Sequence, residues 1–263
     1  MLIDSTAHLP IGLALLDGVF HPPSGSDLAH IIVRWLHFVA GITWIGMLYF
    51  FNLVNVPLQK KLDADTKKKV NPDLLLPALW FFRWGAVITV LAGLTYYAMY
   101  ILGADVSNAN NAGAHLNVWV LLIEWLTYPI VLFIVEFLII KKVPALIKDG
   151  RVFAIVMLIL VAIVTFGLMK FFPAMMGPGN ASNKTLSIGV GGAYGVLMLL
   201  NVWGIIWPAN KRIIGALQGG PAADPTLARQ AFIASRTNAW LSLPMLLFMG
   251  TSSHDWLIFS GGK

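Results

Sequence analysis

Six long apolar stretches divide this chain, and short polar segments separate them. An α-helix rises about 1.5 Å per residue, so each stretch is long enough to cross a hydrocarbon core of roughly 30 Å. The alternation of apolar and polar residues that a transmembrane β-strand needs is missing, and a helix satisfies its own backbone groups in lipid. We therefore expect an all-α, polytopic bundle of about six transmembrane helices. The expected spans lie near residues 28–57, 74–102, 116–140, 152–172, 185–208 and 237–258.

The whole chain, residues 1–263, is expected to form this single membrane domain. Residues 1–27 contain only a short apolar stretch, interrupted by acidic residues and histidines, and no basic region precedes it. This composition differs from that of a signal peptide. It favours an interfacial or re-entrant N-terminal segment.

Composition agrees with a membrane protein. Hydrophobic residues make up 58% of the chain and charged residues only 11%, whereas soluble domains carry about 25% charged residues. The chain has no cysteine, which excludes disulfides, thiolate metal sites and a covalently attached c-type haem.

The positive charges predict an orientation. Most Lys and Arg residues fall in three segments, 58–73, 141–151 and 209–236, on one side of the predicted bundle. The positive-inside rule places these segments in the cytoplasm and both termini outside. We expect a multi-pass protein of the bacterial inner (cytoplasmic) membrane. Its net charge of +6 is then directed at the head groups of the lipid bilayer, and no nucleic acid is expected as a partner.

The first predicted span carries a stripe of unusual residues. His30, Arg34, His37, Gly41 and Trp44 follow the spacing of one helix face. Ionisable residues inside a membrane bundle are costly and indicate a functional site by default.

The last predicted span repeats part of this pattern, because Gly250 lies one turn deeper than His254. Two such helices suit a haem b group. His37 and His254 would be its axial iron ligands, Gly41 and Gly250 would leave room for the ring, and Arg34 would bind a propionate. His115, at the start of the third span, is a further candidate ligand, and His254 could instead be an interfacial residue.

Two carboxyl groups lie within the third span. Glu124 is deep in the membrane, and Arg83 of the second span is its expected partner, either as a structural pair or as a catalytic site for protons or substrate. Glu136 is expected near the inner boundary, paired with Lys141 or Lys142. Polar residues of the last span, Asn238 and Ser242, are expected to hold helices together.

Several stretches resemble a known family. His37 to Gly46 follows an H-x-x-x-G-x-x-W-x-G pattern that also occurs in the J-type protoporphyrinogen oxidases and the copper-resistance D proteins. More specifically, the chain resembles the urate-oxidase N-terminal-like membrane domain of PuuD-type urate hydroxylases. This similarity is carried by Arg34–Asn52, Trp80–Tyr97 and Arg236–His254, in the same order.

The resemblance implies an oxidoreductase of the urate hydroxylase type, which takes electrons from a small-molecule donor (urate or a quinol). PuuD-type proteins end in a fused cytochrome c domain and this sequence does not, so a separate periplasmic cytochrome c is the expected acceptor. Two alternatives stay open. One is a non-catalytic accessory subunit of a larger respiratory or photosynthetic membrane complex, and the other is a transporter, for example of copper.

Overall fold

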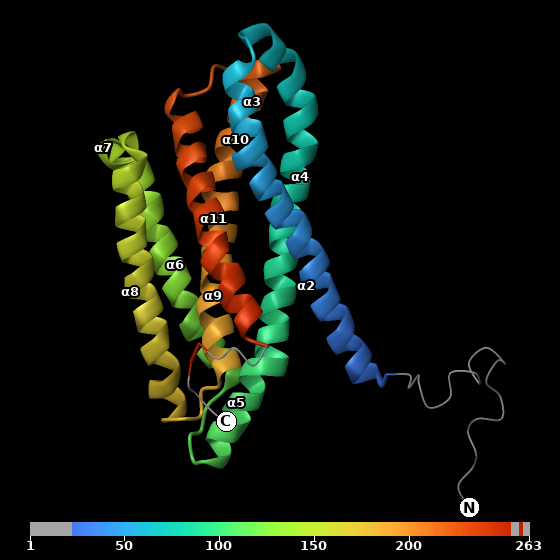
Figure 1. Ribbon diagram of the computed structural model, residues 1–263, viewed down its shortest axis with the longest axis vertical. Coiled ribbons are helices and arrows are strands. Elements are labelled where there is room, and N and C mark those ends of the chain that lie inside the picture. Colours follow the sequence, from blue (N-terminus) through green and yellow to red (C-terminus); the bar gives the residue numbers. More distant parts are fainter. Residues whose placement is uncertain (1–22, 254–257, 260–263) are drawn as a thin grey trace, which may run out of the picture.

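The computed structural model describes residues 23–253 and 258–259, and within them every regular element is a helix. Long helices run side by side and alternate in direction along the chain (Figure 1). Their bounds are α2 Gly25–Tyr49, η1 Phe50–Asn55, α3 Val56–Lys61, α4 Ala64–Tyr96, η2 Tyr97–Leu102, α5 Gly103–Asn111, α6 Val118–Lys142, α7 Pro144–Lys148, α8 Gly150–Met176, α9 Asn183–Asn201, η3 Val202–Ile206, α10 Trp207–Leu217 and α11 Thr226–Thr251. The predicted all-α class is confirmed.

Within the described residues, five continuous helical segments are long and apolar enough to cross a membrane: Gly25–Lys61, Ala64–Asn111, Val118–Lys142, Gly150–Met176 and Asn183–Leu217. They correspond to the first five predicted spans, although the third begins two residues later than predicted. The first part of the sixth predicted span, residues 237–251, lies in α11, and residues 254–257 lie outside the described residues. The helix α11 runs alongside the others (Figure 1) but begins with a more polar stretch containing Arg229 and Arg236. The number of six spans therefore stays a prediction.

The helices extend further than the apolar pattern indicated. The segment Ala64–Asn111 has 48 residues, about 70 Å of helix at 1.5 Å per residue, which is more than twice the thickness of a hydrocarbon core. The predicted span ended at residue 102, whereas residues 103–111 continue the helix past its apolar part as α5.

The three basic segments gather at one end of the bundle. Figure 1 shows α3, α7 and α10 at this end, whereas α5 lies at the opposite end. We call the first end the basic end. The grouping is the one that the charge pattern predicts, and the orientation across the membrane stays a prediction.

Three long helices contain a wider π-helical turn, and two of these turns precede a proline. Pro57 follows η1 and Pro208 follows η3. The proline ring clashes with the carbonyl four residues earlier and offers no N–H in return. A wider turn just before the proline relieves this clash, so both helices continue without a break.

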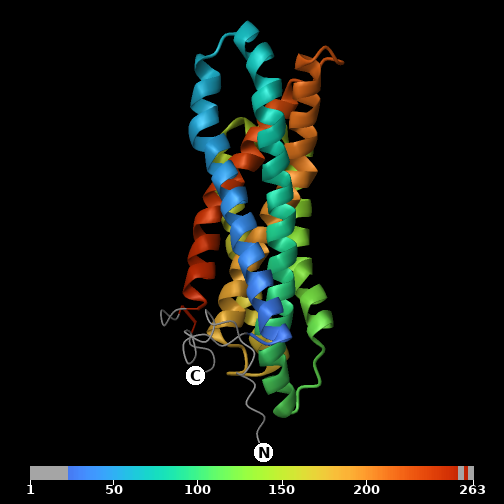
Figure 2. The same cartoon turned by 90° about the vertical axis from the view of Figure 1, so that its right-hand side faces the viewer.

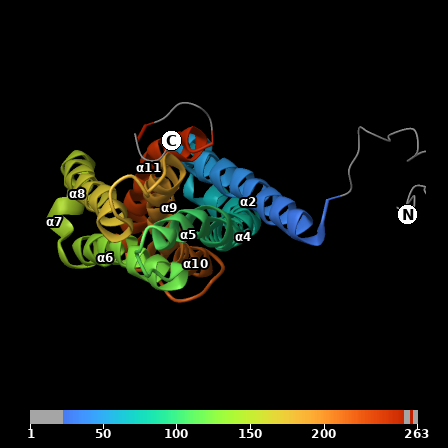
Figure 3. The same ribbon diagram turned by 90° about the horizontal axis from the view of Figure 1, so that it is seen from below.

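The helix α9 lies in the centre of the bundle, with other helices around it when seen from below (Figure 3). Its glycines allow these neighbours to approach closely. A Cβ atom on Gly189 would lie 2.6 Å from Cε2 of Phe172, and one on Gly191 would lie 3.2 Å from the carbonyl oxygen of Met245.

The pair α2 and α4 forms a second close contact, and the two helices lie next to each other in Figure 2. Small residues of α4 at four-residue spacing, Gly85, Thr89 and Gly93, face α2. This spacing places them on one helix face. The histidine stripe of α2 therefore packs against α4.

Candidate functional site

The imidazole of His37 is held by a backbone group of the neighbouring helix. Its Nδ1 lies 2.8 Å from the carbonyl oxygen of Thr89 in α4. A carbonyl oxygen only accepts hydrogen bonds, so Nδ1 carries the proton and donates it. In the neutral ring the lone pair is then on Nε2, which is the usual arrangement of a metal-binding histidine.

The Nε2 atom of His37 is free to meet a ligand. It has no hydrogen-bond partner among the described residues. It is also not fully enclosed by the protein, unlike the buried unpartnered atoms of other side chains. The side chain as a whole is half-buried. One edge of the ring is thus fixed by the protein and the other is open.

Gly93 provides the space for this ring. A Cβ atom at position 93 would lie 2.8 Å from both Nδ1 and Cε1 of His37, closer than real Cβ contacts. Any side chain at Gly93 would therefore displace the imidazole from the Thr89 carbonyl. Gly93 lies within Trp80–Tyr97, one of the stretches that carry the family resemblance, but its contact with His37 could not be predicted from the sequence.

Gly41 and Trp44, which were predicted to face a cofactor, also contact α4. A Cβ atom on Gly41 would lie 3.6 Å from Cγ2 of Thr89, and Trp44 packs against Gly85. The indole Nε1 of Trp44 is enclosed without a hydrogen-bond partner in the described part of the chain. The Gly41 distance is an ordinary van der Waals contact, so packing against α4 leaves room for a Cβ atom there. The role of Gly41 toward a cofactor stays a prediction.

On the N-terminal side of His37, the stripe of α2 continues as a group of basic and aromatic side chains. The Nε2 of His30 lies 2.8 Å from the hydroxyl of Tyr96, and its ring stacks on Tyr100 with centroids 4.1 Å apart. Arg34 is exposed, with its guanidinium carbon 6.0 Å from the Tyr96 ring centre. The guanidinium is therefore available to an anionic group.

The other residues predicted to bind the cofactor lie outside the described residues or at exposed positions. His254 lies outside the described residues, so the predicted pair of His37 and His254 stays untested. Gly250 is exposed, with open space where a side chain would be. His115 is exposed in the turn before α6.

Arg83 and Glu124 do not form the predicted pair. The guanidinium carbon of Arg83 lies 3.7 Å from the ring centre of Trp207 in α10, and no hydrogen bond joins Arg83 to Glu124 in the described structure. Arg83 Nε and Glu124 Oε2 are instead both enclosed without a partner. The Arg83 side chain faces α10 and its aromatic rings, and a role of either residue in catalysis is not tested.

Glu136 has a different environment from the one predicted. Its side chain is fully buried and accepts a hydrogen bond from Nδ2 of Asn201 in α9 at 3.0 Å. Lys141, its expected partner, donates to Gln230 of α11 at 2.6 Å. The spacing on one helix suggested a local ion pair, but the buried amides of other helices could not be located from the sequence.

The polar face of α11 connects several helices, as predicted for Asn238 and Ser242. Asn238 accepts a hydrogen bond from Asn201 at 3.0 Å and donates one to the Met198 carbonyl at 2.9 Å. Ser242 lies 3.0 Å from the hydroxyl of Tyr49 in α2. These contacts join α11 to α9 and α2.

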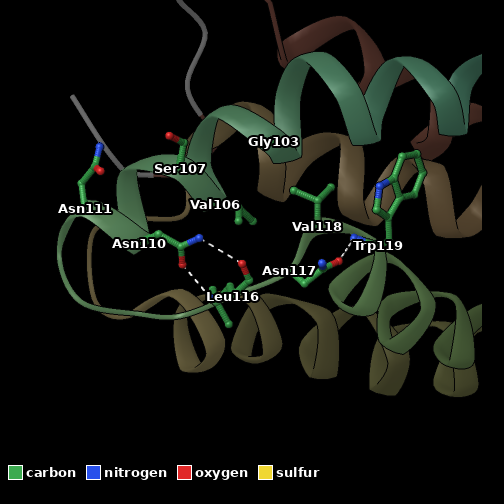
Figure 4. Close-up of a pocket in the computed structure, with 9 residues that line it drawn as sticks. All are labelled: Gly103, Val106, Ser107, Asn110, Asn111, Leu116, Asn117, Val118 and Trp119. Carbon is green, nitrogen blue, oxygen red and sulfur yellow. Dashed lines mark hydrogen bonds between the residues drawn. The ribbon is translucent and has the colours of Figure 1, made fainter.

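A shallow depression of about 400 Å³ lies between α5 and the start of α6 (Figure 4). Two of its three amide side chains already bond within the chain. Asn110 exchanges two hydrogen bonds with the backbone of Leu116, and Asn117 caps the first turn of α6. The depression therefore offers few free polar groups to a ligand.

Among the residues that the structure describes, no three or more His, Asp or Glu side chains gather into a group that could hold a metal ion. Haem iron needs only one or two histidine ligands, and the open Nε2 of His37 is chemically suited to be one of them.

Comparison with known proteins agrees with the resemblance seen in the sequence. The family model described as "Urate oxidase N-terminal" matches residues 24–75 and 64–262. No curated protein and no solved structure matches the chain. Since the two matched segments together cover most of the sequence, the chain belongs to the urate oxidase N-terminal family.

Proposed function

We propose that this chain is a membrane redox protein that binds haem b near the end of the bundle opposite the basic end, with His37 as an iron ligand. The observation that carries the proposal is the bond from His37 Nδ1 to the Thr89 carbonyl, 2.8 Å long. It fixes the ring and leaves the lone pair of Nε2 for the metal. The family match supports this choice, since the resemblance in the sequence is to a urate hydroxylase membrane domain.

The bound group would supply one-electron chemistry, whose potential depends on the axial ligands and on the polarity around them. The residues of the chain would position it. His37 would ligate, the exposed Arg34 would pair with a propionate, and His254 is the second ligand that the sequence proposes. The aromatic group of Tyr96 and Tyr100 would hold His30 and Arg34 in place beside the propionates.

The proposed reaction passes electrons from a small-molecule donor, urate or a quinol, to a separate periplasmic cytochrome c. Each electron removed from the donor is gained by the acceptor, and the donor releases its protons to water or to a base. The bacterial inner membrane is the proposed location, with the basic end in the cytoplasm.

An absorption spectrum of the purified protein tests the proposal. We expect a Soret band and, after reduction, an α band that are lost in His37→Ala and kept in the control Asn108→Ala, whose side chain lies exposed on α5. A colourless wild-type protein that copurifies in fixed ratio with other subunits would support the accessory-subunit alternative instead.

If haem is present, the donor can be identified directly. Oxidised protein is mixed with urate or with a quinol under anaerobic conditions, and the α band is followed. Reduction by urate supports the urate hydroxylase-like activity, and reduction by quinol alone indicates a respiratory electron carrier.

A further inference from the structure

A second polar centre lies away from His37, between α6, α9 and α11. It consists of Glu136, Asn201 and Asn238, whose side chains are all fully buried. Asn201 Nδ2 donates to both of the others, at 3.0 Å each. Asn238 donates in turn to the Met198 carbonyl.

Two oxygen atoms of this centre have no partner. Glu136 Oε1 and Asn201 Oδ1 are both enclosed and bonded to nothing among the described residues. Leaving a buried polar atom unpaired costs about 1–3 kcal/mol, so such atoms usually mark a bound ion, proton or water. Their presence on adjacent, hydrogen-bonded side chains indicates one shared site.

The charged side chains of nearby elements do not neutralise Glu136. Lys141 donates to Gln230, Arg229 to the carbonyls of Ile147 and Lys148, and Arg236 lies over Phe232. On α4, Arg83 lies over Trp207. The only donor bonded to the Glu136 carboxyl in the described structure is the neutral amide of Asn201. A carboxylate with a single neutral donor is too costly to bury without a cation, whereas a carboxylic acid is not.

We propose that Glu136 is an internal proton-binding site of the bundle, which holds a proton on Oε1 together with one bound water molecule. The Oε1–H group donates to the water, and the water donates to Asn201 Oδ1. Both unpartnered oxygens are thereby satisfied, and a buried water with two or more polar partners is a common element of protein interiors.

The site lies nearer the basic end than the opposite end of the bundle. Glu136 lies five residues before Lys141 on α6, which is about 7.5 Å along the helix. The opposite end of α6, Val118, lies 18 residues away, about 27 Å. This proposal does not depend on haem, because it uses only groups of the helix bundle.

Infrared spectroscopy of the protein in lipid tests this proposal. A protonated carboxylic acid has a carbonyl stretch well separated from the carboxylate bands. We expect this band at neutral pH in the wild type and its loss in Glu136→Gln. The matched control is Glu124→Gln, the other carboxyl group within α6, which should leave the band of Glu136 in place.

Asn201→Ala keeps the experiment informative if Glu136→Gln fails to fold. Removal of the hydrogen-bonded amide should shift the frequency of the carboxylic acid band without removing it, whereas Asn108→Ala, at an exposed position, should not shift it. A wild-type spectrum with no protonated-acid band at neutral pH, a protonated-acid band of unchanged intensity in Glu136→Gln, or a frequency unchanged in Asn201→Ala would overturn the proposal.

Discussion

The Nδ1 atom of His37 lies 2.8 Å from the carbonyl oxygen of Thr89, a residue 52 positions later in the chain. This contact joins α2 to α4 and sets which ring nitrogen can bind a metal. Because the partner is a backbone atom, no substitution at Thr89 removes it, but the spacing of the two helices controls it.

Gly93→Ala tests this spacing. The new methyl group would lie 2.8 Å from the His37 ring, so the ring must move away from the Thr89 carbonyl. Loss of such a supporting contact typically weakens metal binding about 10- to 100-fold. We expect a correspondingly lower haem content per protein. Gly46→Ala, in open space on α2, is the control and should keep its haem; equal haem in both variants would argue against the role of Gly93.

The helices and the basic end could be predicted from the sequence because the bilayer imposes them. Each apolar stretch had to form a helix, and the three lysine- and arginine-rich segments had to share a side. Helix ends outside the lipid follow no such constraint. This explains why the predicted span ended at residue 102, although α5, with Asp105 and several asparagines, continues the same helix.

The candidate site was predictable only in part. Its residue types were visible, because histidine and arginine are rare in a span, but the partners of those residues come from other helices. The sequence could not show that His37 meets Thr89 and Gly93, or that Glu136 faces Asn201 and not Lys141. A periodic pattern gives the face of one helix, and packing decides what that face meets.

Gly189→Ala should destabilise the centre of the bundle. Its Cβ atom would lie 2.6 Å from Phe172 and 3.1 Å from the Tyr97 hydroxyl. Both side chains are fully buried and have little room to move. Such overpacking costs about 1–3 kcal/mol, so the thermal unfolding midpoint in detergent should fall.

The control for that variant is Gly215→Ala in α10, where a Cβ atom meets nothing within 4 Å. Alanine is favoured over glycine inside a helix by about 1 kcal/mol, so this midpoint should stay the same or rise. A stable Gly189→Ala variant would mean that α9 is less closely packed than described.

Asn238→Ala should weaken the attachment of α11 to α9. The change removes the hydrogen bond to the Met198 carbonyl and the acceptor for Asn201 Nδ2. Each buried polar group left unpaired costs about 1–3 kcal/mol of folding free energy. We expect a lower unfolding midpoint and faster proteolysis of the loop before α11. Asn108→Ala, at an exposed position of α5, should change neither, and equal behaviour of the two variants would contradict the described contact.

The start of α4 should depend on pH. The side-chain carboxylate of Asp63 accepts two hydrogen bonds from Thr66, one from its hydroxyl at 2.7 Å and one from its backbone N–H at 2.9 Å. These bonds hold the pKa of Asp63 below its ordinary value. A lowered pKa in the folded helix means that the cap is fully present above the ordinary value of 3.8 and is lost as the pH falls through the folded pKa.

Hydrogen exchange measures this loss. After correction for the intrinsic rate, the amide of Thr66 should be protected near neutral pH and exchange faster in acid. In Asp63→Ala it should exchange fast at every pH. Protection that is independent of both pH and the substitution would show that Asp63 does not cap α4.

Replacement of the proposed ligand by a cavity tests the central claim most directly. In His37→Gly, the electron paramagnetic resonance and absorption spectra of the purified protein should lose the signature of the wild-type haem. Added imidazole, which can occupy the space of the missing side chain, should restore it. A His37→Gly protein whose haem spectrum equals that of the wild type before any imidazole is added would contradict the account.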